Sequence, residues 1–525
     1  KNCIIKSGNN VSLFWAHNGS PILENCLFIA DSVLIAVQHH GGNGHFSDLI
    51  IQNCTLVKSE QFGIRSTGYA RPDIINSIIY SNELADIQTS FSGTDDGSYL
   101  TITYSRVDST YSDDLLGTTS TVGNGNIHSD PLFIDSVVED YNLRSDSPSI
   151  DAGDPTSPLD PDGSLADLGA YPSPYGTPVP IVIDVPNDYS TIQAGLNAAN
   201  ERDTVLVQPG TYYENIIWPE TNGIKLISAV DSSNTIIDGQ LQGTVIRISP
   251  LAAFIDSNTI IENFQIISGG NATYGGGLYI KNAAPKLINI AINNCSSLNK
   301  GGGIYLESSG MRLENARVCN NNSIEEGGGI YMTNSSPVLK NVTINQNTSK
   351  AGGGLYLVDN SSPVITGCSV SFNTASYSNG GGIFMWQYCS PQINNTEIIG
   401  NHASSRGGGV SMVYHCDPII TNVKIQGNDT NDRGGGVVID GHCDPIFQDV
   451  DIIRNSAKYW GGGLHIASYS YPVIRKSIIA LNYTTGGSAP WEPIPIGGGI
   501  HVYSHSSPTV RNSTIFNNHA INGHG

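Results

Sequence analysis

Charged side chains are scarce in this sequence, and basic ones most of all. Only 14% of the 525 residues are charged, with 25 Lys and Arg against 46 Asp and Glu, so the formal net charge is −21. An acidic surface repels phosphate backbones and anionic headgroups, so we expect neither nucleic acid nor a membrane surface as a partner. Long apolar runs are also absent. No stretch approaches the roughly 18 residues of a membrane-spanning helix, so we expect no membrane insertion.

Cysteine is rare as well, with 9 residues, whereas glycine is abundant with 59. With so few charges, turns and uncharged polar residues must keep the surface soluble. The chain opens on KNCIIKSGNN, which holds neither an initiator Met nor the apolar core of a signal peptide, and it stops on INGHG in mid-pattern. We therefore expect it to be an internal part of a longer protein.

A GGG triplet followed by alternating apolar and aromatic residues recurs through the second half of the chain. The triplets begin at Gly275, Gly301, Gly327, Gly352, Gly380, Gly407, Gly434, Gly461 and Gly497, at spacings of 25 to 28 residues and a last spacing of 36. Each unit holds two short strand patterns separated by a turn such as NSSP. An Asn recurs at one corner of the units, at Asn347, Asn373, Asn401, Asn428, Asn455, Asn482 and Asn518.

Units this short leave no room for a crossover helix, so each strand must pair with its counterpart one unit later. This predicts a parallel β-helix, in which each unit is one rung. Two columns of apolar residues then face its core, one from Ile304 to Ile500 and one from Leu306 to Val502.

The first rung needs a cap, and residues 182–218 supply one. Ser190 and Gln193 have capping-box spacing. Ile192, Leu196 and Ala199 share one helical face. We therefore expect an amphipathic capping helix at about residues 190–200.

The segment VPNDYSTIQAGLNAANERDTVLVQPGTYYENI resembles the start of right-handed β-helices of the pectin lyase-like superfamily, where a helix plugs the N-terminal end. The GGGIY repeats are also similar to those of chlamydial polymorphic outer-membrane proteins, which have GGA where this chain has GGG. The first resemblance implies a right-handed helix, in line with the crossover preference. It also implies a substrate groove along an exposed β-face, and a protein exported by a bacterial cell.

The first 171 residues predict the C-terminal part of a separate β-helix. Asn-Cys dipeptides recur there at residues 2, 25 and 53, and its final segment resembles the closing segment of secreted bacterial β-helix proteins. Residues 172–180 contain four prolines, which predicts a semi-rigid linker. The predicted fold is therefore all-β, with two tandem right-handed parallel β-helices, the second spanning 181–525 with its GGG rungs at 275–525.

One column of the second β-helix is expected on its outer face. The residue two past each triplet points away from the core, and five of these residues in succession are aromatic. Their rings would form a platform for sugars. Alternatively, they only stabilise the sheet as a ladder. The candidate ligand-binding residues are Tyr279, Tyr305, Tyr331, Tyr356, Phe384, Trp386, Tyr388, His465 and His501.

The turns between the two strands of a rung hold the best candidate for acid–base chemistry. His415 and His442 occupy the same position in neighbouring rungs, followed two residues later by Asp417 and Asp444. Neighbouring carboxylates raise each other's pKa, and a nearby imidazole suits proton transfer. The alternative is ordinary corner structure, since Asp before Pro is common in turns. The stacked Cys389, Cys416 and Cys443 would form a buried ladder, or one adjacent pair a disulfide.

Calcium is the one cofactor that the sequence suggests. Asp160, Asp162 and Asp167 surround a Gly turn in DPDGSLAD and are candidate calcium ligands, with an Asp-rich turn as the alternative.

Two functions fit these features. The first is a non-catalytic, secreted or cell-surface protein that binds polysaccharide or a surface protein, or associates with itself into filaments. Uninterrupted rungs and the lack of a catalytic signature favour it. The second is a polysaccharide lyase or glycoside hydrolase acting on the exposed β-face, which needs a walled cleft with carboxylates within about 5 to 10 Å.

Overall fold

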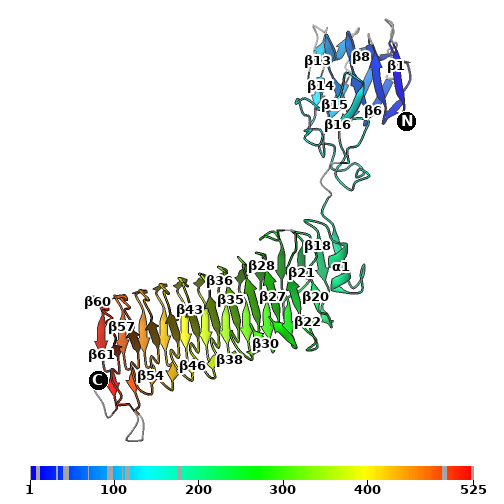
Figure 1. Cartoon of the computed structure of the whole chain (residues 1–525). Coiled ribbons are helices and arrows are strands. Elements are labelled where there is room, and N and C mark those ends of the chain that lie inside the picture. Colours follow the sequence, from blue (N-terminus) through cyan, green and yellow to red (C-terminus); the bar gives the residue numbers. More distant parts are fainter. Residues whose placement is uncertain are drawn as a thin grey trace. The chain divides into compact units, whose positions relative to one another are not determined.

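Two compact units make up the chain, Lys1–Val179 and Pro180–Gly525, and the division falls at the end of the proline-rich segment. The computed structural model describes residues 2–7, 12–30, 33–39, 47–68, 70–90, 99–108, 110–112, 119–174, 179–252, 254–486 and 493–521. Both units consist almost wholly of short β-strands (Figure 1), which confirms the predicted all-β class. None of the described residues form a helix that could span a membrane.

The first unit is a parallel β-helix with three sheets. They run from β1 (Ile4–Ser7) to β10 (Ile78–Tyr80), from β2 (Phe14–His17) to β13 (Thr110–Ser112), and from β3 (Ile22–Glu24) to β14 (Thr119–Val122). Cys26 and Cys54 are buried in its core. An antiparallel pair, β15 (Phe133–Asp135) and β16 (Asp140–Leu143), lies in the predicted closing segment.

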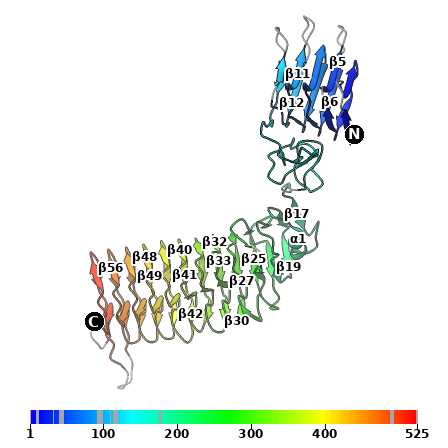
Figure 2. The ribbon, with the colours of Figure 1, turned by 45° about the horizontal axis from the view of Figure 1, so that its top comes forward.

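The second unit is a longer parallel β-helix with four sheets, seen side-on in Figure 2. Sheet 1 has thirteen strands, from β17 (Val182–Val185) to β60 (Thr509–Arg511), and sheet 2 has twelve strands, from β19 (Gly210–Tyr212) to β61 (Thr514–Phe516). Sheet 3 has eleven strands, from β20 (Ile216–Ile217) to β59 (Ile500–Val502). Sheet 4 has ten strands, from β26 (Ala272–Tyr274) to β62 (His519–Ala520).

Strands pair with their counterparts in the next rung, as the repeat predicts. In sheet 3, Tyr305 of β31 (Ile304–Glu307) pairs with Tyr279 of β27 (Leu278–Lys281) and with Tyr331 of β35 (Ile330–Thr333). The same position in successive rungs therefore forms a straight column along the rod.

The predicted capping helix is present as α1 (Ile192–Ala198), and it buries Ile192 and Leu196 over the first rung. Its N-cap is Thr191, whose side chain accepts a hydrogen bond from the backbone of Ala194, and not Ser190 as the sequence suggested. The helix begins one residue later because the Glu214 carboxylate from the following rung accepts the first two helical N–H groups. A partner from another rung thus replaces the local capping box.

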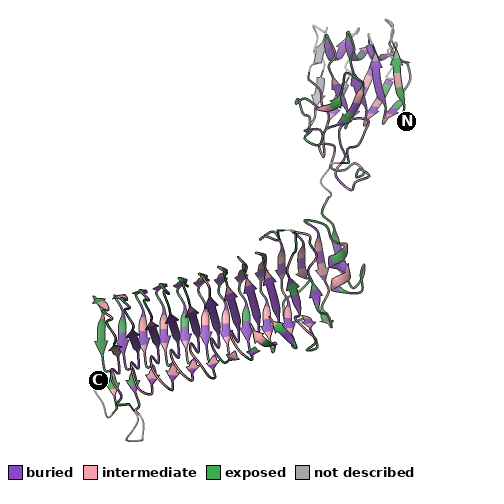
Figure 3. Ribbon diagram, in the orientation of Figure 1, coloured by how far each residue is buried: buried purple, intermediate pink, exposed green. Residues whose placement is uncertain are grey.

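The two predicted apolar columns lie in the core of the second unit, together with inward columns of sheets 1 and 2 that contain Leu313 and Val318. Their members from Ile304 to Leu464 and from Leu306 to Ile466 are fully buried, and the purple interior in Figure 3 follows them. In the last described rung, Ile500 is partly buried and Val502 is exposed.

The corner asparagines form a buried ladder, which confirms the expectation that the same amide recurs at one corner. The side-chain oxygen of Asn401, for example, accepts hydrogen bonds from the backbone and side-chain nitrogens of Asn373. Its own amide donates to the Val370 carbonyl and to Asn428. The rungs from Asn321 to Asn518 are thereby held together by polar groups that would be costly to bury unpaired.

The GGG triplets precede the strands of sheet 3 and let neighbouring rungs approach closely. Gly327 has a φ of +66°, a left-handed conformation that favours glycine. A Cβ added to Gly328 would lie 2.5 Å from the Thr348 carbonyl oxygen, and one added to Gly329 would lie 2.6 Å from that of Gly354. An alanine at the third position of the triplet would therefore collide with the carbonyl of the next rung, which explains why this chain has GGG and not GGA.

Candidate functional site: a column of stacked tyrosine and histidine rings

The predicted aromatic column of sheet 3 exists, but the prediction that it is exposed is wrong. The rings stack from rung to rung, with centroids 5.3 Å apart and planes 2° apart for Tyr305 and Tyr331. They lie outside the main core, in a cluster of their own. Their exposed fractions are nevertheless only 8% for Tyr279, 6% for Tyr305, 3% for Tyr331, 5% for Tyr356 and 1% for Phe384.

Side chains that directly precede the triplets at Gly275 and Gly301 cover two of these rings. Tyr274 stacks on Tyr305 at 4.9 Å, and the Lys300 ammonium lies 4.6 Å from the centroid of Tyr331 and donates to its hydroxyl at 2.8 Å. Burial raises the pKa of Tyr305 and of Tyr356. The column is therefore a structural ladder, the alternative that the sequence left open.

A second column of rings is exposed, in the turns between sheets 3 and 1. We call Tyr388, His415, His442, Tyr469 and His505 the turn ladder. Successive centroids lie 5.2, 5.2, 5.4 and 4.9 Å apart, with interplanar angles of 4° to 9°. Because the faces cover one another, the outer edges, which carry hydroxyl groups and ring nitrogens, face solvent. Tyr388 is 58% and Tyr469 45% exposed.

The backbone of the turn ladder is left-handed at every rung. The φ angles are +59° at Tyr388, +57° at His415, +60° at His442, +60° at Tyr469 and +61° at His505. In two earlier rungs Asn334 and Asn360 hold the same position with φ of +48° and +62°. Asn and His tolerate this conformation far better than Tyr, which lacks a short polar group to stabilise it locally.

Tyr414 adds an exposed ring beside the ladder that the sequence analysis did not single out. It is 50% exposed, and its ring lies over Gly441 of the next rung, where an added Cβ would be 3.1 Å from the ring. Trp386, a predicted ligand-binding residue, is half-buried and contacts Tyr414 at 5.8 Å. The signal in the sequence was an aromatic residue followed one rung later by glycine.

The four candidate catalytic residues share two neighbouring turns. Asp417 accepts the backbone N–H of Asp444 at 2.6 Å, and Asp444 accepts that of Tyr471 at 2.7 Å. Each carboxylate thus stabilises the turn of the next rung through one oxygen. Both Asp residues and both imidazoles, His415 and His442, are exposed.

Beneath these turns, Cys389, Cys416 and Cys443 are fully buried free thiols. The backbone N–H of Cys416 donates to the sulfur of Cys443 at 3.2 Å. The column is therefore a buried ladder and not a disulfide.

His465 and His501, the other predicted ligand-binding residues, end the column of sheet 3. Their rings stack 5.0 Å apart, with the two Nδ1 atoms at 2.9 Å. His465 is 1% exposed, and its Nε2 has no hydrogen-bond partner. Burial lowers the pKa of His465 to about 2, helped by His501 and two arginines. Only His501 is partly accessible to a ligand.

In the candidate calcium loop, each of the three carboxylates accepts hydrogen bonds from the protein itself. Asp160 accepts the backbone N–H of Asp167, Asp162 accepts the N–H and hydroxyl of Ser164, and Asp167 accepts the N–H of Asp151. Burial raises the pKa of Asp167 to about 6. Within the described ranges, no group of three or more His, Cys, Asp or Glu is placed to hold a metal ion. The loop is an Asp-rich turn, as in the alternative interpretation.

Comparison with solved structures finds several similar chains. The Agl-KA catalytic domain is 15% identical over 67% of this chain and 69% of its own, with a TM-score of 0.37. Pectin methylesterase PemA from Erwinia chrysanthemi is 8% identical, over 52% and 90%, with a TM-score of 0.30. The A-module of the Azotobacter vinelandii mannuronan C-5 epimerase AlgE4 is 14% identical, over 64% and 96%, with a TM-score of 0.33.

No curated protein matches the sequence. The family model for right-handed β-helix regions matches residues 211–402 and 353–525. These overlapping ranges cover more than half of the chain, and they agree with the parallel rungs and the predicted handedness. The chain therefore belongs to the right-handed β-helix family.

Proposed function

We propose that this chain is an extracellular carbohydrate-binding protein whose turn ladder contacts the glycan. One observation carries the proposal: Tyr and His rings stack in an exposed column over five successive turns, and two of them are Tyr at a left-handed position that suits Tyr poorly. A strained backbone conformation costs about 1–3 kcal/mol per residue, and such strain concentrates at functional sites. Stability alone would favour Asn, as at Asn334 and Asn360.

The exposed groups suit the chemistry of sugars. Tyrosine hydroxyls and imidazole nitrogens along the ladder can donate to and accept from sugar hydroxyls. The exposed ring of Tyr414 offers an apolar surface for the C–H face of a pyranose. The ladder repeats once per rung, so it suits a chain ligand that lies along the rod and repeats at a similar distance.

The charge around the ladder favours a neutral glycan. Asp417 and Asp444 are exposed beside it, and the chain as a whole carries a net charge of −21. A polyuronate would be repelled by both.

Glycan-array binding with a double variant tests this proposal. Tyr388→Asn/Tyr469→Asn removes two rings from the ladder at positions where the backbone suits Asn. We expect the affinity for a neutral oligosaccharide to fall at least about tenfold, which corresponds to the loss of one or two polar contacts. The matched control is Tyr377→Asn, a 79% exposed tyrosine outside the ladder, which should bind normally. Unchanged binding by the double variant, or a preference for uronates, would contradict the proposal.

A second candidate function rests on the four residues around the turns. Asp417 and Asp444 each use one carboxylate oxygen for the turn, which leaves the second for chemistry beside the exposed imidazoles. A polysaccharide lyase or hydrolase would release new unsaturated or reducing ends. Asp417→Asn/Asp444→Asn keeps the carbonyl acceptors for the turn while removing both charges. If activity is found and this variant retains it, these residues are not catalytic.

The proposal places the chain outside the cell, as its likeness to exported β-helices and to chlamydial surface proteins suggests. Filament formation would be a further property of the same rod. Sedimentation at rising protein concentration tests it, and a single monomeric species throughout would argue against filaments.

A further inference from the structure

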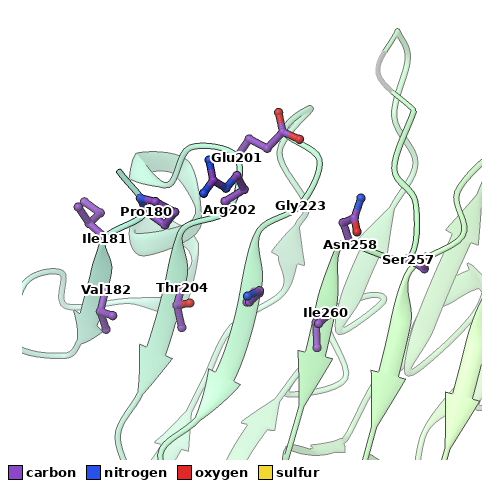
Figure 4. A pocket seen from close by; sticks show the side chains of 11 residues that line it. Pro180, Ile181, Val182, Glu201, Arg202, Thr204, Gly223, Ser257, Asn258 and Ile260 are labelled. Atoms are coloured by element: carbon purple, nitrogen blue, oxygen red, sulfur yellow. The ribbon is translucent and has the colours of Figure 1, made fainter. Parts of the chain in front are cut away.

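Three cysteines of the second unit share one buried column, away from any surface hollow. A groove of about 670 Å³ on sheet 1, over the first rungs, is lined by side chains of mixed character that include Glu201 and Arg202, and none of its lining residues is a cysteine (Figure 4). Cys389, Cys416 and Cys443 instead occupy the same position in three consecutive turns between sheets 3 and 1. All three are fully buried and belong to the apolar core beneath the turn ladder.

The three thiols have the same orientation. Each donates to the carbonyl oxygen three residues earlier, at 3.4 Å for Cys389, 3.4 Å for Cys416 and 3.2 Å for Cys443. The strands that precede these turns pair in register, and they are β43 (Ile383–Trp386), β47 (Val410–Val413) and β51 (Val437–Asp440). Because the orientation is the same on paired rungs, the sulfur atoms repeat at the spacing of the rungs, about 4.8 Å.

Serine meets the structural needs of this position in the neighbouring rungs. Ser361, one rung before the cysteines, and Ser470, one rung after them, donate to the same carbonyl position at 2.7 Å. The Ser470 oxygen also accepts the backbone N–H of Cys443 at 3.2 Å, just as the Cys443 sulfur accepts that of Cys416. A hydroxyl therefore forms the same hydrogen bonds as the thiol. The stability of the turn does not explain why three rungs in succession have cysteine.

The spacing of the sulfur atoms suits a metal ion that takes two ligands in a line. A metal–sulfur bond is about 2.3 Å long, so an ion midway between two sulfur atoms needs them roughly 4.6 Å apart. Neighbouring rungs supply about that distance. Zinc needs four ligands in a tetrahedron, which donors in one straight column do not offer. Thiolates select soft ions such as Cu(I), and Cu(I) accepts two ligands in linear coordination.

We propose that this column binds one Cu(I) ion between Cys416 and a neighbouring cysteine, either Cys389 or Cys443. The two thiols release their protons to solvent as the two copper–sulfur bonds form, and no electron is transferred. The resulting complex carries one negative charge. The backbone N–H of Cys416, which points at the Cys443 sulfur, stabilises that charge. The surrounding apolar core keeps water from adding as a further ligand.

Loss of the thiol protons leaves the neighbouring carbonyl groups paired. The Val413 oxygen, which accepts from the Cys416 thiol, also accepts the backbone N–H of Gln387 at 3.1 Å. The Asp440 oxygen accepts that of Tyr414 in the same way, at 3.1 Å. Deprotonation of these two cysteines therefore creates no buried carbonyl without a partner, which would be costly.

An ion reaches the column through the turns above it. The residue directly before each cysteine is an exposed member of the turn ladder, namely Tyr388, His415 or His442. Opening one turn exposes the thiol below it, and local opening of this kind costs less than global unfolding. The site goes beyond the proposed function, because the ion lies beneath the ladder and not on its exposed edge.

Competition with the Cu(I) chelator bicinchoninate, on the reduced whole chain without oxygen, tests the proposal. Cys416→Ser leaves Cys389 and Cys443 two rungs apart, too far to share an ion, so this variant should bind one tight Cu(I) fewer per chain. Affinity at the site should fall more than about a hundredfold, since loss of a group outside the ligand shell already costs about 10–100-fold. Any ion held by Cys26 and Cys54 of the first unit is common to both chains and cancels.

Further variants test the position of the ion within the column. Cys389→Ser and Cys443→Ser should each keep the ion, because Cys416 retains one neighbour. The double variant Cys389→Ser/Cys443→Ser should lose it, which repeats the test with Cys416 in place. The matched control is Cys368→Ser, which removes a buried thiol with no cysteine one rung away and should bind as the unaltered chain does. The double variant of the turn ladder should also bind Cu(I) normally, which separates this site from the proposed function.

Two further measurements report on the ion itself. X-ray absorption of the bound copper should show two sulfur ligands and no nitrogen. Cu(I) should also raise the unfolding midpoint of the unaltered second unit and leave that of Cys416→Ser unchanged, because an ion that binds only the folded state stabilises it.

Three results would overturn the proposal. They are equal Cu(I) binding by Cys416→Ser and the unaltered chain, an equal loss of binding in Cys368→Ser, and nitrogen ligands on the bound copper. The last result would instead assign the ion to the exposed imidazoles of His415 and His442.

Discussion

The environment of a residue in this rod depends on which residue occupies the same position one rung away. His465 shows this most clearly, because its Nδ1 meets the Nδ1 of His501 from the next rung, while its buried Nε2 has no partner. A proton on His465 would place a charge beside His501, Arg433 and Arg406 in a buried site. The fold therefore holds this imidazole neutral.

Acid should destabilise the second unit through His465. Its folded pKa of about 2 lies below the unfolded value of about 6.5, so the unfolded state binds the proton first as the pH falls. The stabilising contribution is complete above pH 6.5 and is lost below it, by up to about 2 kcal/mol at pH 5. Denaturant unfolding of the unaltered chain and of His465→Phe at pH 7 and pH 5 measures this difference.

In His465→Phe the acid-induced loss should shrink by that amount, since Phe suits a column that holds aromatic rings at other rungs. His505→Phe is the control, because His505 is exposed. An identical pH dependence in His465→Phe and the unaltered chain would show that His465 does not resist protonation.

At the scale of elements, two ring ladders in neighbouring columns have opposite environments. The sheet 3 ladder around Tyr331 is buried, in part beneath Tyr274 and Lys300, and the turn ladder is exposed. Stacking geometry alone does not distinguish them, since centroid distances are 5.3 Å for Tyr305 and Tyr331 and 5.2 Å for His415 and His442. Burial decides that the first stabilises the sheet and that the second is available to a ligand.

Replacing Tyr331 by Ala should therefore reduce stability and leave glycan binding intact. Tyr331 is stacked between Tyr305 and Tyr356 and is bonded to Lys300, so its loss creates a cavity in a closed cluster. We expect a cost of about 3–5 kcal/mol in the free energy of unfolding, typical of a buried aromatic residue. Tyr377→Ala, at an exposed position, should cost far less. If a folded Tyr331→Ala variant lost its affinity for glycan, the sheet 3 ladder would have to be part of the binding surface.

At the scale of the whole molecule, each unit has a core of its own. The second unit's core extends from Ile183 to Ile479, and the first unit's core from Ala16 to Val107. In a solenoid, each rung contacts only its neighbours, so stability adds up along one unit. The capping helix α1 closes the first rung of the second unit by itself.

Residues 180–525 expressed alone should accordingly fold as they do in the whole chain. Circular dichroism and thermal unfolding of this fragment, set beside the unaltered chain, provide the measurement. The unfolding midpoint of the fragment should match the corresponding transition of the whole chain. A fragment that is unfolded or aggregated would mean that the first unit contributes to its stability.

The spacing of the triplets and of the corner asparagines determined the rungs, the parallel pairing and the two core columns. Those features depend on contacts between equivalent positions one rung apart, and a regular repeat displays them directly. Tertiary structure alone decided which outer column is covered and that Glu214, from the following rung, accepts the first two N–H groups of the capping helix. Each depends on how side chains from different columns and connections meet in space, which the period of the repeat does not encode.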